Sequence, residues 1–230
     1  MKSGVFVITG ATRGIGAATA RMAERDGYRV VLAARDVDAL RHREGEDVRV
    51  RACDVRSWEQ VSGLFEWVLA EWGRVDVVLA NAGVSVDTSF TTDDGDPPDT
   101  WTDMVVTNVC GPAFTARAAM PALIASRGHL LLTGSASGRG VRPGNLYSAT
   151  KWAVTGLAQG LRAECVGTGV RVTVVQPGLT DTGCVPASRA GDPKLAPEDV
   201  GRAVMYAVSQ PPGVDVNEIL VRPVGQAAHR

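Results

Sequence analysis

The sequence lacks an excess of basic residues: 24 Lys and Arg face 25 Asp and Glu, which gives a formal net charge of −1. A general nucleic-acid binder needs surplus Lys and Arg to neutralise phosphates, so that class of protein is excluded. No stretch approaches the roughly 18 uninterrupted apolar residues of a membrane-spanning helix, and we expect no membrane segment. The opening MKSGVFVITG has no cleavage-site pattern and predicts a first strand instead of a signal peptide.

Cysteine and histidine are scarce and scattered. The four Cys and three His include no C-x-x-C pair and no metal-ligand spacing, so we expect no bound metal. So few cysteines without a secretory signal fit a reducing, cytoplasmic compartment. We expect each of them to be a small apolar residue of the interior; they are Cys53, Cys110, Cys165 and Cys184.

Low-complexity tracts, internal repeats and a domain boundary are also missing. The 230 residues are 45% apolar and 21% charged, close to the averages of globular proteins. A chain of this length buries roughly 70–75% of its unfolded surface and needs no disulfide or metal to fold. We therefore expect residues 1–230 to form one domain.

What the chain does contain is an alternation of short apolar runs with helix-length segments. The runs are mostly apolar on both faces, as strands of a buried parallel sheet are, and the run at 48–52 is weaker because Arg49 and Arg51 alternate with its apolar residues. The sequence predicts strands at 5–8, 29–33, 48–52, 75–80, 129–133, 170–176 and 218–221, and helices at 14–26, 57–71, 100–126, 146–168 and 197–209. This order predicts a single Rossmann-type, doubly wound α/β domain, with about seven parallel strands and helices on both faces.

Local signals refine this arrangement. Ser57, three residues before Gln60, predicts a capping box at the start of the second helix. Two long loops, 84–99 and 183–196, follow strands at the carboxyl edge, where ligands bind in such sheets. The first loop has five Asp and no Lys or Arg, and we expect it to be solvated.

A glycine-rich turn joins the first strand to the first helix, where residues 9–16 have the sequence TGATRGIG. Glycines let the backbone turn tightly and approach a pyrophosphate, whose charge then meets the helix N-terminus. No Gly-Lys-Ser/Thr closes the turn, which excludes a Walker A loop. Its position after a strand and before a helix favours a dinucleotide site over a purely structural turn.

The end of the second strand bears on which dinucleotide is bound. NAD binders carry an acidic residue there for the ribose 2′-hydroxyl, whereas this chain has Ala34 followed by Arg35. Arg35 and Arg13 offer charge-assisted hydrogen bonds to a 2′-phosphate. We predict NADP(H) as the cofactor; the alternative is two solvated arginines.

Tyr147 and Lys151 lie four residues apart and share one face of a predicted helix. A nearby ammonium favours the phenolate and lowers the pKa of a tyrosine, which then exchanges a proton with an alcohol or carbonyl near neutral pH. The motif is weak by itself and gains weight from its position after the fifth strand. Upstream, the Ser135 hydroxyl can hydrogen-bond the reacting oxygen.

Together these motifs resemble the short-chain dehydrogenase/reductase family over essentially the whole chain. The resemblance implies four catalytic positions and a cofactor site in the family's order. The catalytic positions are Asn108, Ser135, Tyr147 and Lys151; the cofactor positions are Gly10, Thr12, Arg13, Gly14, Ile15 and Gly16 in the turn, Arg35 at the 2′-phosphate, Asp54 and Val55 at the adenine, Asn81, Ala82 and Gly83 along the cofactor, Pro177, Gly178 and Thr182 at the nicotinamide carboxamide, and Tyr147 and Lys151.

The chemistry implied is hydride transfer between NADP(H) and a small carbonyl or secondary alcohol. The resemblance makes Tyr147 the general acid or base, with Lys151 lowering its pKa and holding the ribose hydroxyls. It assigns Ser135 to the substrate oxygen and Asn108 to a water in a proton relay. It also implies a homodimer or homotetramer, packed through the helices at 100–126 and 146–168.

Three departures from the family pattern stand out. Ala80 replaces the first Asn of N-N-A-G, which removes one side chain that braces the sheet. The interval from Ser135 to Tyr147 is one residue shorter than in many members, so Ser137 is an alternative to Ser135. The segment after Thr182 is too short for a long lid over the substrate.

The tail at 214–223 is similar to that of bacterial NADP-dependent members acting on 3-hydroxy acids, serine-like amino acids or miscellaneous carbonyls. A 3-hydroxy acid would need a cation, for which Arg139, Arg142 and Arg189 are candidates; the alternative is that each is a solvated arginine. One alternative is a 3-oxoacyl-thioester reductase, which would need a basic surface for an acidic carrier protein. Another is a sensor that binds NADP(H) without turnover.

Overall fold

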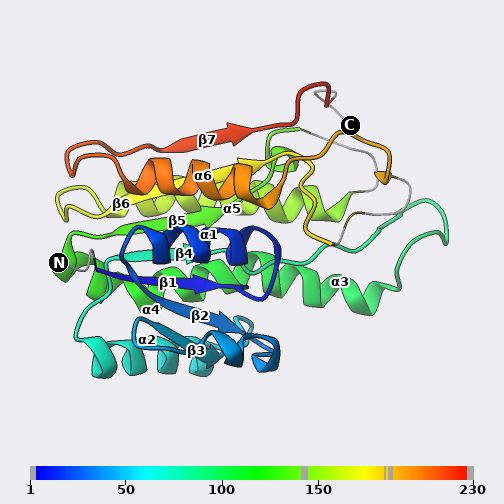
Figure 1. Ribbon diagram of the computed structural model, residues 1–230. Coiled ribbons are helices and arrows are strands. Elements are labelled where there is room, and N and C mark those ends of the chain that lie inside the picture. The colour runs from blue at the N-terminus through cyan, green and yellow to red at the C-terminus, as the bar shows by residue number, and fades with distance from the viewer. Residues whose placement is uncertain (1–3, 141–144, 184, 186–188, 227–230) are drawn as a thin grey trace.

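The computed structural model describes residues 4–140, 145–183, 185 and 189–226 (Figure 1). Seven strands form one sheet in the order β3-β2-β1-β4-β5-β6-β7, and every neighbouring pair is parallel. The strands are β1 Val5–Thr9, β2 Arg29–Ala34, β3 Val48–Ala52, β4 Val77–Ala80, β5 His129–Thr133, β6 Arg171–Pro177 and β7 Glu218–Val221. The predicted doubly wound α/β fold is confirmed.

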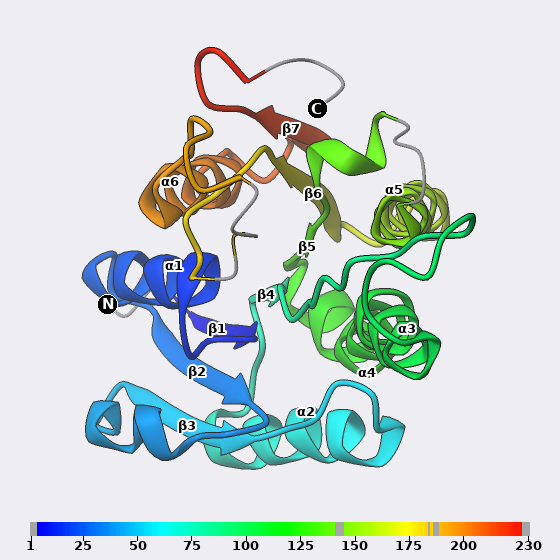
Figure 2. The ribbon, with the colours of Figure 1, turned by 90° about the vertical axis from the view of Figure 1, so that its right-hand side faces the viewer.

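Helices cover both faces of the sheet, with α1 and α6 on one side and α2, α4 and α5 on the other (Figure 2). Their bounds are α1 Gly14–Arg25, α2 Trp58–Trp72, α3 Pro98–Val105, α4 Gly111–Ser126, α5 Leu146–Glu164 and α6 Pro197–Val208. Short 3₁₀ turns lie at Asp38–Arg43 and Ala136–Gly138. Right-handed connections between parallel strands produce this two-sided cover.

Alternation along β1 shows why the sheet needs cover on both sides. Val5 and Val7 belong to the core under α2, α4 and α5, whereas Phe6 and Ile8 belong to the core under α1 and α6. Successive side chains of a strand point to opposite faces, so a run that is apolar throughout must be buried twice. Phe6 and Ile8 are both completely buried.

The helix predicted at 100–126 is instead two α-helices joined by a π-helical turn at Val106–Cys110. Pro112 lies in the first turn of α4 and has no N–H, so it cannot donate the α-type hydrogen bond to the Asn108 carbonyl. A π turn changes which carbonyls are left free and is frequent at functional sites. The predicted end of α5 at residue 168 was also wrong, because that helix ends at Glu164.

The capping box predicted at α2 is half formed. The Ser57 hydroxyl accepts from the Gln60 backbone N–H at 3.2 Å, as expected for an N-cap. The Gln60 side chain does not return to Ser57; its Oε1 accepts from the Asp54 backbone N–H at 2.9 Å. The Asp54 N–H, in the turn before α2, therefore binds the side-chain oxygen that a capping box would offer to the Ser57 N–H.

β3, in which Arg49 and Arg51 alternate with apolar residues, lies at the edge of the sheet. Its arginines are accommodated by aromatic rings of α2. The Arg51 guanidinium lies 4.9 Å from the Trp67 ring centroid, and that of Arg49 lies 5.6 Å from the Trp72 centroid. Cation–π contacts of this kind stabilise arginine side chains of β3 where they pack against α2.

No helix in the ranges described has the length and apolar character to cross a membrane. Cys53, Cys110 and Cys165 are free thiols, and Cys184 lies outside the described residues. Burial raises the pKa of the Cys53 thiol to about 11, which keeps that side chain neutral in the interior.

Candidate functional site

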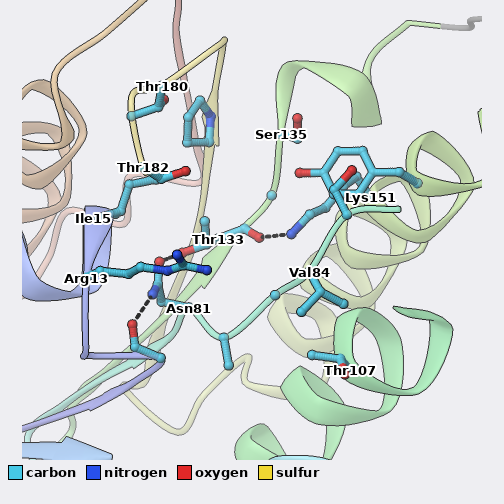
Figure 3. Close-up of a pocket in the computed structure, with 18 of the residues that line it drawn as sticks. Arg13, Ile15, Asn81, Val84, Thr107, Thr133, Ser135, Lys151, Thr180 and Thr182 are labelled. Carbon is cyan, nitrogen blue, oxygen red and sulfur yellow. Dashed lines mark hydrogen bonds between the residues drawn. The ribbon is translucent and has the colours of Figure 1, made fainter. Parts of the chain in front are cut away.

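A cavity of about 590 Å³ opens at the carboxyl ends of the strands, where β1 lies between β2 and β4. Such a switch in strand order is where ligands bind in open α/β sheets. The cavity is lined by seventeen of the predicted residues, namely Gly10, Thr12, Arg13, Gly14, Ile15, Arg35, Asp54, Val55, Asn81, Ala82, Gly83, Ser135, Tyr147, Lys151, Pro177, Gly178 and Thr182. Figure 3 shows part of this lining.

Gly16 is predicted at the cofactor but is absent from the cavity wall. A β-carbon there would lie 2.4 Å from the Gly10 carbonyl oxygen, so this glycine lets α1 pack against the turn. Gly10 has φ +65°, and a β-carbon on it would lie 2.8 Å from the Ala82 Cα. Both glycines therefore keep the turn close to the β4 loop, and Gly16 also lets α1 pack against it.

The first turn of α1 faces the cavity without a side-chain cap. Arg13 is the N-cap residue and makes no cap hydrogen bond, and the turn has no acidic residue. The first N–H groups of a helix have no intrahelical acceptors, so this end of α1 presents donors and a positive dipole. The Arg13 side chain extends toward the cavity in Figure 3.

Asn81 joins the ends of three neighbouring strands. Its Nδ2 donates to the Thr9 carbonyl at 3.2 Å and the Gly10 carbonyl at 3.1 Å, and its Oδ1 accepts from the Thr133 hydroxyl at 3.2 Å. The Thr9 hydroxyl accepts from the Asn81 backbone N–H at 3.0 Å. These contacts brace the sheet under the cavity although Ala80 has no polar side chain.

Positively and negatively charged side chains lie together at the end of the cavity near β2 and β3. Arg35 is exposed on the cavity wall. The Asp54 carboxylate is held by the Arg56 guanidinium at 2.7 Å, and this hydrogen bond lowers the pKa of Asp54. Asp36, which also lines the cavity, accepts from the Asp38 backbone N–H at 3.0 Å. Arg35 thus presents a positive charge at this rim, and both nearby carboxylates have local donors.

The other end holds Tyr147, Ser135 and Lys151. Burial raises the pKa of Tyr147, and a hydrogen bond with Ser135 lowers it in part. Lys151 is 4% exposed, its Nζ lies 5.6 Å from the Tyr147 ring centroid, and it donates to the Thr133 carbonyl at 2.9 Å. Burial lowers the pKa of Lys151 to about 8.

The pKa of Tyr147 differs from what the sequence predicts for the Tyr147–Lys151 pair. Lys151 was expected to lower the pKa of Tyr147, but desolvation of the phenol raises it. The physical reason is that Lys151 is buried and Tyr147 is partly buried, and desolvation disfavours the phenolate and the ammonium alike. The serine that hydrogen-bonds with Tyr147 is Ser135, and Ser137 contributes its backbone N–H to the Ser135 hydroxyl at 3.1 Å.

Asn108, from the π turn, lies behind the cavity wall. Its Oδ1 accepts from the Val84 N–H at 2.9 Å, and its Nδ2 donates to the Val84 carbonyl at 2.8 Å and the Thr150 hydroxyl at 3.1 Å. Thr150 in turn donates to the Tyr147 carbonyl at 2.7 Å. Asn108 therefore fixes the loop after β4 and the first turn of α5, instead of contributing its side chain to the cavity.

Two further residues position the start of α5. Asn145 is its N-cap and accepts from the Ser148 N–H at 2.9 Å, and the Thr88 hydroxyl accepts from the Leu146 N–H at 3.0 Å. Asn145 lines the cavity beside Tyr147. An Asn directly before a helical segment is an N-cap signal that could have indicated this residue. Thr88 comes from the acidic loop, and no local signal predicts its contact.

Two of the three candidate cations for a substrate carboxylate, Arg139 and Arg189, have other partners. Arg139 pairs with Glu218 and donates to Gln176 Oε1 at 3.2 Å, away from the cavity wall. Arg189 lines the cavity but pairs with Asp192 at 2.8 Å. Arg142 lies outside the described residues. The five aspartates of the loop at 84–99 are exposed and do not line the cavity.

The segment after β6 closes the side of the cavity near Ser135. Pro177, Gly178 and Thr182 line it as predicted, together with Thr180. Gln226, from the turn after β7, also lines the cavity. Nothing in the local sequence indicates Gln226, because it reaches the site only through the pairing of β6 with β7.

Comparison with known proteins places this chain in a family. The family model described as short chain dehydrogenase matches residues 4–193. An uncharacterised oxidoreductase of Staphylococcus aureus (strain N315) is 39% identical over 227 residues, covering 96% of this chain and 97% of the relative.

Two solved structures extend the likeness to the fold. An alcohol dehydrogenase from the archaeon Thermococcus sibiricus, complexed with 5-hydroxy-NADP, has a TM-score of 0.88 and 33% identity, and the match covers 97% of each chain. The serine dehydrogenase of Escherichia coli has a TM-score of 0.86 and 29% identity, covering 97% of this chain and 99% of that one. The chain therefore belongs to the short-chain dehydrogenase family of oxidoreductases.

Proposed function

We propose that the protein is an NADP(H)-dependent reductase or dehydrogenase of a small carbonyl or secondary alcohol. The observation that carries this proposal is one continuous cavity with an exposed arginine at one end and the Ser135–Tyr147–Lys151 group at the other. Its volume of about 590 Å³ lies within the range of ligand pockets, roughly 300–1,000 Å³.

The residues along the cavity fit a dinucleotide phosphate. Gly10 lets the backbone approach a pyrophosphate. The first backbone N–H groups of α1, which no side chain caps, can donate to its oxygens, and the positive end of the helix dipole favours its negative charge. Arg35, with Arg13, would bind the 2′-phosphate, since β2 ends without a carboxylate that would repel it. The Thermococcus relative was solved with 5-hydroxy-NADP, which supports the same preference.

When bound, NADPH supplies the hydride for a carbonyl carbon. Tyr147 keeps its proton near neutral pH because burial raises its pKa, so it is ready to donate to the carbonyl oxygen. Ser135 lies within hydrogen-bonding reach of the phenol and orients the same oxygen. The Lys151 ammonium favours the phenolate that remains, and in the alcohol-oxidising direction these proton steps run in reverse.

Asn108 supports this arrangement from behind. Its hydrogen bonds to Val84 and Thr150 hold the loop after β4 and the helix turn that carries Tyr147. We assign the backbone carbonyl of Asn108 as the acceptor that holds a water in the proton relay. Pro112 has no N–H and cannot make the α-type hydrogen bond to this carbonyl. Asn108 is therefore a positioning residue, because its side chain acts on the site through Val84 and Thr150.

The test is oxidation of NADPH and NADH by the purified protein against aldehydes, ketones, 3-oxo acids and 3-oxoacyl thioesters. Turnover with NADPH on one class supports the proposal and names the substrate class. Turnover confined to thioesters would favour the 3-oxoacyl-thioester reductase instead. NADPH binding without turnover on any class would favour the sensor.

The remaining assignments follow the same proposal. We assign a homodimer or homotetramer packed through α4 and α5, where Trp152 is 45% exposed and Ile124 is 44% exposed. We also assign a cytoplasmic location, in keeping with the free thiols of the described residues. Size-exclusion chromatography with light scattering tests the first assignment, and cell fractionation tests the second.

A further inference from the structure

The turn that follows β7 folds back onto the segment that follows β6. The Gly178 N–H donates to the Val221 carbonyl at 2.6 Å, and the Leu179 N–H donates to the Gln226 Oε1 at 3.1 Å. The turn is closed by the Arg222 guanidinium, which donates to the Gln226 carbonyl at 2.8 Å. The two segments are therefore joined by backbone and side-chain hydrogen bonds.

Their approach is close enough to require glycine at position 178. A β-carbon on Gly178 would lie 2.3 Å from the Gln226 Oε1 and 2.8 Å from the Pro223 Cδ. Contacts at these distances leave no room for a side chain at position 178 while the turn packs against the segment. The Gln226 amide is held by the hydrogen bond that its Oε1 accepts from the Leu179 N–H.

Leu179 is fixed from two sides. Its carbonyl accepts from the Leu195 N–H at 2.8 Å, and its N–H donates to Gln226. Both Leu179 and Gln226 line the cavity, on the side formed by β6, whose neighbour β5 leads to Ser135. Because the hydride must be delivered beside Ser135 and Tyr147, the nicotinamide end of the cofactor must lie against this part of the wall.

We propose that Gln226 is a positioning residue for the nicotinamide end of the cofactor, acting through the backbone at Gly178 and Leu179. This inference rests on the proposed function. The acceptor on Gln226 fixes the Leu179 N–H, and with it the wall at 178–179, before the cofactor arrives. A site that is already in shape binds more tightly because binding does not have to order it.

The experiment compares two ligands and three variants. NADPH reaches both ends of the cavity, whereas 2′,5′-ADP carries only the adenosine half. Gln226→Leu removes the acceptor, and Gln226→Glu keeps an acceptor oxygen. Gln210→Leu is the control, since the Gln210 side chain donates to the Tyr206 carbonyl at the exposed end of α6.

Gln226→Leu should raise the Kd for NADPH about five- to tenfold, the worth of one hydrogen bond, and leave that for 2′,5′-ADP unchanged. Gln226→Glu should lose less affinity for NADPH than Gln226→Leu, because it keeps the acceptor oxygen, and Gln210→Leu should bind both ligands as the native protein does. An unchanged Kd for NADPH in Gln226→Leu, an equal loss for both ligands, or a loss in Gln226→Glu as large as in Gln226→Leu would overturn the inference. A native protein that binds neither ligand would overturn the proposed function and this inference together.

Discussion

Burial of Lys151 should make the protein less stable than it would be with an apolar residue at that position. Desolvation lowers the pKa of this amine from 10.5 to about 8, a penalty of about 3 kcal/mol at roughly 1.4 kcal/mol per pKa unit. Lys151→Met removes the buried charge and also loses the hydrogen bond to the Thr133 carbonyl, which offsets about 1 kcal/mol. We therefore expect the variant to be about 2 kcal/mol more stable at pH 7 and to have lost turnover.

The pH dependence identifies the cause. Between the two pKa values the unfolded chain binds more protons than the folded one, so the free energy of unfolding of the native protein rises with pH. The advantage of Lys151→Met should shrink by about 2 kcal/mol between pH 7 and about pH 9.5, and disappear there. Urea unfolding at both pH values measures it.

Lys194 provides the control for that experiment. Its Nζ donates to the Ala190 carbonyl at 2.7 Å in an exposed position, so Lys194→Met loses a similar hydrogen bond without relieving burial. It should show no stabilisation at either pH. If Lys151→Met were no more stable than the native protein at pH 7, or if its advantage did not change with pH, the burial argument would be refuted.

The remaining predictions concern the cavity and the helix that carries Tyr147. Tyr147→Phe should abolish turnover while NADPH still binds, as measured by fluorescence; substantial remaining activity would contradict its role as the proton donor. Ser135→Ala should lower kcat more than Ser137→Ala, because Ser135 is the serine that hydrogen-bonds with the phenol; the reverse order would mean that Ser137 orients the substrate. Arg35→Ala should raise the Kd for NADPH much more than that for NADH, and equal effects would contradict a 2′-phosphate contact. Asn145→Ala should lower the free energy of unfolding by about 1 kcal/mol, with Asn145→Asp restoring it, because the residue caps α5; no loss in urea unfolding would show that the cap is dispensable.

Local patterns account for what could be predicted of the fold and the site. Apolar runs and helical periodicity depend on neighbours in the chain, and they predicted all seven strands and their parallel pairing. The same holds for the glycine turn before α1 and for the spacing of Tyr147 and Lys151, since four residues bring two side chains to one face of a helix. Arg35 was predictable because it directly follows β2.

Predictions that assumed a side chain would choose its nearest partner were less reliable. Gln60 was expected to return to Ser57 but bonds to the Asp54 backbone, because the preceding turn brings that donor closer. Arg139 was a candidate for a substrate carboxylate, but the pairing of β6 with β7 places Glu218 beside it. Neither competitor can be recognised from spacing alone.

The sequence by itself determined the order of strands and helices, the turn that approaches a pyrophosphate, and the residue types of the proton-transfer group, because each depends on contacts within a few residues. Only the tertiary structure decided how those residues are held. Burial, which raises the pKa of Tyr147 and lowers that of Lys151, comes from elements packed around α5. The hydrogen bond from Leu179 to Gln226 depends on where β7 is added to the sheet, since residues this far apart in the chain meet only through strand order and register.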